Sequence, residues 1–275
     1  MKTITRIRDY AGKRSEKVGD YSLRKSARAT RFLIGVADVF LFWGRVFRNT
    51  FSRGFEFREF LKQCFMIGNK SLGLISITGI IVGLVLTIQS RPVLVDFGAE
   101  GMLPGMVAIS IVREMGPVIT ALICAGKIGS SMGAELGSMR VTEQIDAMEV
   151  SSTNPFKFLI VPRVLAATLM LPFLVLYADA LGIFGSWVAA NIKGDVSLVL
   201  FINQAFKSLE FMDLIPAFIK TFFFGFVIGM VGCFKGFHAG RGTESVGVAA
   251  NSAVVMASLL VIVVDLVAVQ ITDLI

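Results

Sequence analysis

Five long apolar stretches, separated by short polar segments, follow one another from about residue 71 to the C-terminus. A helix needs about 20 mostly apolar residues to cross the hydrocarbon core of a membrane, and each stretch reaches about that length. The first is expected to stop at Arg91-Pro92. To within several residues, the pattern predicts spanning helices over 71–90, 103–127, 164–191, 214–237 and 248–274. The sequence therefore predicts an all-α integral membrane protein.

The apolar stretch from Arg31 to Arg48 has a different pattern. Arg31, Asp38 and Arg45 recur every seven residues, so on a helix they form one narrow polar stripe. Such a stripe is typical of an amphipathic helix lying in the membrane interface. An interfacial helix is favoured, because a spanning helix would expose Asp38 and Arg45 to lipid. The alternative is a sixth span, which would move the C-terminus to the cytoplasmic side.

Charge divides the chain into three regions and predicts its orientation. Residues 1–30 form a basic cytoplasmic tail that carries most of the net charge of +7. Residues 31–70 are expected to form interfacial and elbow helices, and residues 71–275 the transmembrane domain. With a cytoplasmic N-terminus, most Lys and Arg residues of the connecting segments lie inside, as membrane proteins prefer. Five spans then place the C-terminus in the periplasm.

The composition argues against a soluble enzyme or a nucleic-acid-binding protein. Hydrophobic residues make up 55% of the chain and charged residues only 17%, against about 25% charged in soluble domains. So apolar a chain leaves little soluble surface for a nucleic-acid-binding patch. Gly126-Lys127 is followed by Ile128, so it is not a phosphate-binding loop. Metal-ligand and disulfide spacings are absent from the sequence. Any active transport is expected to be driven by another chain or by an ion gradient.

Charged residues within the predicted spans are the strongest functional signal. Arg113-Glu114 lies near the middle of the second span, where charge is expensive and usually functional. Adjacent residues on a helix point about 100° apart, so these two do not readily pair with each other. Pro117 cannot donate to the carbonyl of Arg113, which favours a local distortion there. A substrate site is one interpretation, and a buried structural ion pair is the other.

Three further charged residues, in later spans, are candidates for a position inside the membrane. Lys220 either neutralises Glu114 or extends to the outer surface. Asp179 and Asp265 are interpreted as helix-packing residues. A few cations among many apolar side chains would suit an amphipathic anion such as a phospholipid.

The segment between the second and third spans predicts a short amphipathic helix over about 141–150, before Asn154-Pro155. Its apolar positions are Val141, Ile145 and Met148. Its acidic positions are Glu143, Asp146 and Glu149. Such a helix either engages a cytoplasmic motor protein or simply lies on the membrane surface.

Three runs of sequence carry a resemblance to a known family. They are IVREMGP over 111–117, AGKIGSS over 125–131 and AELGSMRVTEQIDAME over 134–149. Together with Glu56-Phe-Arg58, Asn154-Pro155 and Pro162-Arg163, they resemble the MlaE (YrbE) family of ABC-transporter permeases. The similarity covers most of the chain from about Glu56 onward and does not explain residues 1–30.

The resemblance implies a homodimer in the bacterial inner membrane, with an N-terminal interfacial helix and five spans per subunit. A cytoplasmic ATPase would bind ATP and Mg, so this chain itself would hold no cofactor. A membrane-anchored MCE-domain lipid-binding protein would sit on the periplasmic side, and a regulatory subunit is left open. The implied task is to move phospholipids between the inner membrane and the periplasm, for outer-membrane lipid homeostasis.

The resemblance also implies roles for individual residues. The substrate pathway would contain Arg113, Glu114, Lys220, Leu86, Gln89 and Val93. The coupling helix on the ATPase would contain Val141, Glu143, Gln144, Ile145, Asp146, Met148 and Glu149. Two other classes stay open. One is an ion-coupled secondary transporter that uses Glu114 and Lys220 as a proton relay, although the expected inverted repeat is not evident. The other is a structural membrane scaffold.

Overall fold

The computed structural model describes residues 33–52, 55–192, 194, 196–272 and 274. The chain divides into two units, residues 1–48 and residues 49–275. Residues 33–50 are helical, and large apolar side chains such as Phe40 are exposed on them. The interfacial position of this helix stays a prediction, and the basic tail over 1–30 lies outside the described residues.

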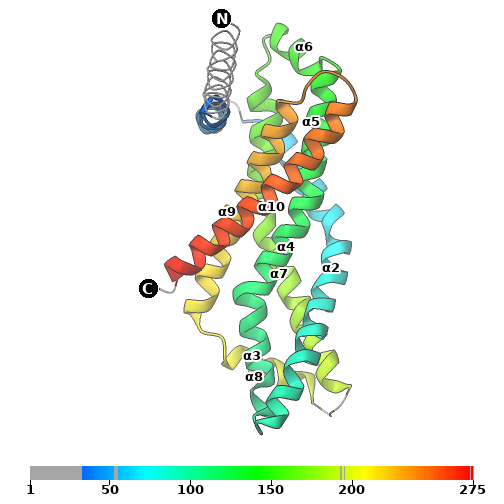
Figure 1. The fold of residues 1–275 in the computed structure, drawn as a ribbon, viewed down its shortest axis with the longest axis vertical. Coiled ribbons are helices and arrows are strands. Elements are labelled where there is room, and N and C mark those ends of the chain that lie inside the picture. The colour runs from blue at the N-terminus through cyan, green and yellow to red at the C-terminus, as the bar shows by residue number, and fades with distance from the viewer. Residues whose placement is uncertain (1–32, 53–54, 193, 195, 273, 275) are drawn as a thin grey trace, which may run out of the picture. The chain divides into compact units, whose positions relative to one another are not determined.

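Among the described residues, five helical runs of the second unit are long and apolar enough to cross a membrane (Figure 1). The prediction of five spans is therefore confirmed. The spans are α2 (Phe57–Asp96), a second run over Glu100–Val141, a third over Phe156–Asn191, α9 (Phe211–Phe237) and α10 (Glu244–Thr272). The second run comprises η1 (Glu100–Met102), α3 (Leu103–Ser110), η2 (Ile111–Met115), α4 (Gly116–Cys124), η3 (Ala125–Gly129) and α5 (Ser130–Val141). The third comprises η4 (Phe156–Ile160) and α7 (Val161–Asn191).

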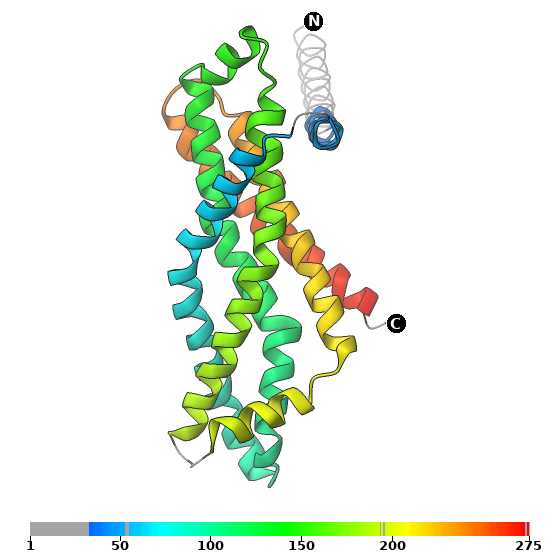
Figure 2. The ribbon, with the colours of Figure 1, turned by 180° about the vertical axis from the view of Figure 1, so that it is seen from behind.

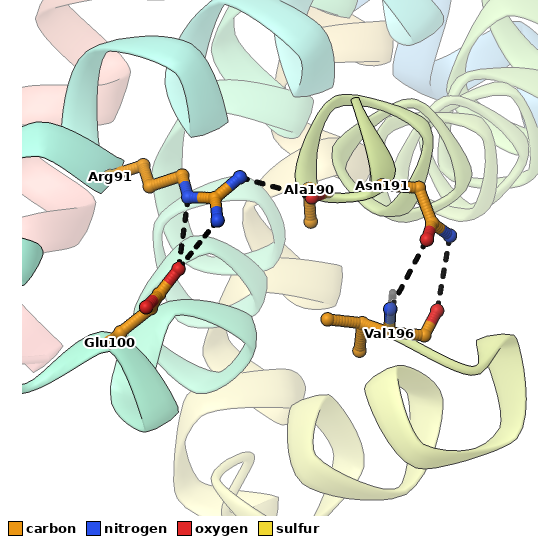
Figure 3. A network of polar contacts seen from close by, with 5 residues as sticks. All are labelled: Arg91, Glu100, Ala190, Asn191 and Val196. Carbon is orange, nitrogen blue, oxygen red and sulfur yellow. Dashed lines mark hydrogen bonds and ion pairs between the residues drawn. The ribbon is translucent and has the colours of Figure 1, made fainter. Parts of the chain in front are cut away.

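The first span does not stop at Arg91-Pro92, so that prediction is wrong. Helix α2 continues through Pro92 to Asp96. A proline removes one backbone hydrogen bond and does not by itself end a helix whose neighbours hold it in place. Arg91 supplies such a hold, because its guanidinium donates to Glu100 Oε1 and to the carbonyl of Ala190 (Figure 3).

The backbone distortion predicted near Pro117 takes the form of a wide helical turn. Residues Ile111–Met115 form a π-helix, and Gly116 N–H donates to the carbonyl of Ile111, five residues back. Single π turns are frequent at functional sites because the extra residue changes the direction of the side chains that follow. Here the turn contains both Arg113 and Glu114.

Small residues allow close contacts between the spans. A Cβ at Gly83 of α2 would overlap the carbonyl oxygen of Gly182 in α7. A Cβ at Gly225 of α9 would lie 2.5 Å from the carbonyl oxygen of Ala167, also in α7. In lipid, where apolar burial drives little helix association, such close backbone approach provides the packing contacts. Helix α7 therefore packs closely against both α2 and α9.

A short helix lies at each end of the bundle (Figures 1 and 2). Helix α6 (Gln144–Val150) connects the second and third spans at one end. Helix α8 (Leu198–Lys207), which was not predicted, packs on α3 at the opposite end. Its signal in the sequence is an amphipathic spacing, because Phe201 and Ala205 are buried while Val199 is exposed.

Candidate functional site

The charged residues of three spans meet in one cluster. Lys220 Nζ of α9 lies 2.9 Å from Glu114 Oε2 in the π turn and 3.0 Å from Asp265 Oδ1 of α10. Its side chain is 5% exposed, so the cation is buried between two carboxylates. Lys220 therefore pairs with Glu114 rather than extending to the surface. Such pairing offsets the cost of an ion away from water.

A second ion pair lies beside the first. Arg113 Nη1 is 3.6 Å from Asp213 Oδ1, in the first turn of α9. The wide turn thus directs its two adjacent charged residues to different partners, as their angular separation on a helix requires. The cluster holds one more carboxylate than cations, which differs from the cation-rich pocket expected from the sequence.

Asp213 and Asp265 are members of the cluster that the sequence analysis missed. Asp265 was noted as an intramembrane charge but interpreted as a packing residue. Asp213 precedes the predicted start of the fourth span, so it did not count as intramembrane. Its partner Arg113 is distant in the sequence, and hydropathy carries no information on such pairing.

An amphipathic cavity of about 690 Å³ opens beside this cluster. Arg113, Asp213 and Lys220 form its polar side. Its apolar side consists of Ile215, Ile219, Phe223 and Ile271, from α9 and α10. Ligand sites commonly combine mostly apolar walls with a few polar groups that fix orientation. The cavity can therefore hold a molecule with one charged end and one hydrocarbon end.

Asp179 of α7 lies against Gly116, which begins α4 directly after the π turn that contains Arg113 and Glu114. Its side chain is 7% exposed, and no described residue forms a hydrogen bond with its Oδ1 atom. A Cβ at Gly116 would overlap this oxygen, so the absence of a side chain at residue 116 makes room for the carboxyl group. The contact fits the predicted packing role of Asp179 between α7 and α4.

The predicted cavity residues of the first span lie elsewhere in this single chain. Leu86 packs against the buried cluster around Phe201 and Ile111, whereas Gln89 and Val93 are exposed on α2. None of these three lines the cavity that contains Arg113 and Lys220. Their role in the substrate pathway stays a prediction.

The segment predicted as the coupling helix is broken in the structure. Val141 ends α5, Glu143 has a left-handed backbone (φ 58°), and α6 begins at Gln144. Left-handed geometry interrupts a helix, so one continuous helix over 141–150 is wrong. The burial of the side chains in this segment nevertheless agrees with the predicted apolar and acidic faces. Ile145 is buried and Val141 and Met148 are partly buried, whereas Glu143, Gln144, Asp146 and Glu149 are exposed.

An ion pair links this short helix to the bundle. Arg140 in the last turn of α5 pairs with Asp146 of α6. The same guanidinium lies 5.9 Å from the ring centroid of Phe237, at the end of α9. Arg140 thus connects α6 to two spans, and Asp146 is the predicted coupling residue that this connection involves.

Comparison with known proteins identifies the family. The profile of the family described as Permease MlaE matches residues 60–271. A protein of Rickettsia prowazekii named probable ABC transporter permease protein is 39% identical over 203 residues, which cover 74% of this chain and 78% of that protein. The intermembrane phospholipid transport system permease protein MlaE of Haemophilus influenzae is 36% identical over 212 residues, covering 76% of this chain and 81% of that protein. The chloroplastic protein TRIGALACTOSYLDIACYLGLYCEROL 1 of Arabidopsis thaliana is 35% identical over 77% of this chain and 61% of that protein.

The five long apolar helical runs and the family match together identify a multi-pass helical membrane protein. Within that class, the chain belongs to the MlaE family of ABC transporter permeases. The resemblance stated from the sequence motifs is therefore confirmed.

Proposed function

We propose that two copies of this chain form the membrane part of an ABC transporter that moves phospholipids between the bacterial inner membrane and the periplasm. A separate ATPase supplies the energy from the cytoplasmic side, at the α6 end. An MCE-domain protein exchanges lipid at the α8 end. In this orientation the N-terminus is cytoplasmic and the C-terminus periplasmic.

The amphipathic cavity beside Lys220 is the observation that carries the proposal. Its apolar wall suits acyl chains, and its polar floor contains two cations, Arg113 and Lys220, and one carboxylate, Asp213. A floor with both charge signs fits a zwitterionic or anionic phospholipid headgroup better than a simple anion, because each headgroup charge finds an opposite partner. The name of the Haemophilus influenzae relative, a phospholipid transport permease, favours the same class of substrate.

A cavity-filling substitution tests the substrate site. We expect Ile219→Trp to reduce ATP-driven phospholipid transfer from proteoliposomes to an acceptor protein by about tenfold, because the indole occupies space that the lipid needs. Ile81→Trp on α2 is the matched control, since the two isoleucines are 50% and 49% exposed and Ile81 does not line the cavity. Equal transfer by the two variants would remove the cavity from the lipid pathway. Uptake driven by a pH gradient without ATP would instead favour ion coupling through Glu114 and Lys220.

Charge reversal on α6 tests the coupling role. Glu143→Lys with Asp146→Lys is expected to abolish co-purification of the ATPase and lipid transfer together. Exchanging Arg140 and Asp146 (Arg140→Asp with Asp146→Arg) keeps their ion pair but changes the charge of α6. If the exchanged variant binds the ATPase normally, the acidic surface of α6 is not the docking determinant.

A further inference from the structure

A second groove lies at the α8 end of the bundle, away from the charged cluster. It has a volume of about 480 Å³ and is bounded by the end of α2, by η1 and α3, and by α8. Its apolar side consists of Leu94, Met102, Met106 and Ile109. Its polar side includes Gln204, Lys207 and Ser208, from the last turn of α8 and the residue that follows. The groove is therefore amphipathic, like the cavity beside Lys220.

Lys207 differs from the cations of the cluster because no described residue supplies a countercharge for it. Among the described residues that line the groove it alone is charged, and no described residue forms an ion pair with it. By contrast, Arg91 nearby is paired with Glu100, at 2.6 Å. The groove thus presents one available ammonium group beside an apolar wall.

The edges of the groove are held in place by polar contacts. The ion pair between Arg91 and Glu100 fixes the η1 turn, and the Asn191 side chain exchanges hydrogen bonds with the backbone of Val196 just before α8 (Figure 3). Helix α3 and the end of α8 approach each other so closely that a Cβ at Gly105 would overlap the Ser208 hydroxyl. A preformed groove costs less ordering entropy when a ligand binds.

The second span contributes lining residues to both the groove and the cavity. Ile109 lines the groove, and Arg113, one helical turn further along, lines the cavity. A molecule that leaves the cavity toward the α8 end therefore meets the groove next.

We propose that this groove is a second phospholipid site, in which Lys207 binds the headgroup phosphate and the four apolar residues contact an acyl chain. The inference rests on the proposed function and adds an intermediate site near the periplasmic surface. An ammonium group is a common phosphate ligand. The competing role for Lys207 is to stabilise the C-terminus of α8 through the helix dipole, and that role does not require lipid.

Photocrosslinking separates these roles. Benzoylphenylalanine replaces Met102, which lines the groove and is 69% exposed, in protein held in nanodiscs with ³²P-labelled phosphatidylglycerol. We expect Lys207→Glu to reduce the labelled crosslink at least fivefold and Lys207→Arg to preserve it. The probe at Val199, which is 67% exposed on α8 and does not line the groove, should report equal crosslinking in all variants. Excess inorganic phosphate should not compete, because it lacks the acyl chain.

A second variant blocks the groove without changing its charge. A Cβ at Gly101 meets nothing within 4 Å, so Gly101→Phe is expected to fold and to reduce the crosslink at residue 102 as strongly as Lys207→Glu. Unchanged crosslinking in both variants, or crosslinking to a co-purifying protein instead of lipid, would overturn the proposal. The crosslink needs no ATP, so its loss tests the groove alone. The proposed function would instead be overturned if the wild-type protein failed to transport lipid.

Discussion

The seam between α2 and α7 and the charged cluster at Lys220 join helices in opposite ways. At the seam, Gly83 and Gly182 bring two backbones into contact and leave no space for side chains. At the cluster, long charged side chains bridge the second span, α9 and α10, and a cavity of about 690 Å³ lies beside them. The cavity thus lies where ion pairs, rather than backbone contacts, connect the spans.

Removing the central cation should produce the largest loss of stability. Lys220→Met leaves Glu114 and Asp265 without their shared partner, and an uncompensated buried charge costs about 3–5 kcal/mol. We expect a large fall in the unfolding free energy, measured by denaturant titration in mixed micelles. Lys62→Met is the matched control, because the Lys62 side chain is 64% exposed and should change stability little.

Neutralising all three members of the cluster should recover most of this loss. Lys220→Met with Glu114→Gln and Asp265→Asn leaves no unpaired ion, and replacing a whole buried ion pair is often close to neutral. If the triple variant is as unstable as Lys220→Met alone, uncompensated charge is not the cause.

A smaller loss is expected from crowding the seam. Gly83→Ala places a methyl group against the Gly182 carbonyl and must separate α2 from α7, which typically costs about 1–3 kcal/mol. Gly73→Ala on the same helix is the control, since a Cβ there meets nothing within 4 Å. The same titration compares the two variants, and equal stability would show that the close approach does not hold the seam.

The smallest effect on stability is expected at the edge of the cluster. Arg113 is 38% exposed and lies 3.6 Å from Asp213, and such pairs contribute about 0–1 kcal/mol. Arg113→Gln should therefore leave the unfolding free energy within about 1 kcal/mol of the wild type while lowering lipid transfer. Normal transfer by this variant would restrict the substrate contacts to Lys220 and the apolar wall.

The sequence predicted those features that depend on single segments. Hydropathy over about 20 residues located all five spans, and the cost of intramembrane charge singled out Arg113, Glu114 and Lys220. Each of these signals lies within a single segment of the sequence and does not depend on contacts with other segments.

Features that depend on contacts between segments were missed or misplaced. The first span continues past Pro92, where Arg91 bonds to Glu100 and to the Ala190 carbonyl. Glu100 lies beyond the end of the helix, and Ala190 is about 100 residues away in the sequence. Asp213 and Asp265 join the cluster only through partners on other spans. The break at Glu143 requires a left-handed backbone conformation, and a glutamate in the sequence does not indicate that conformation.

The unbroken length of α2 has a mechanical consequence. Its 40 residues extend about 60 Å at 1.5 Å per residue, roughly twice the thickness of the hydrocarbon core. A helix of that length must tilt or protrude, and any rotation of it about the close contact between Gly83 and α7 would move its two ends in opposite directions. Such a rotation would link the position of Phe57 to that of Arg91, because one helix carries both residues.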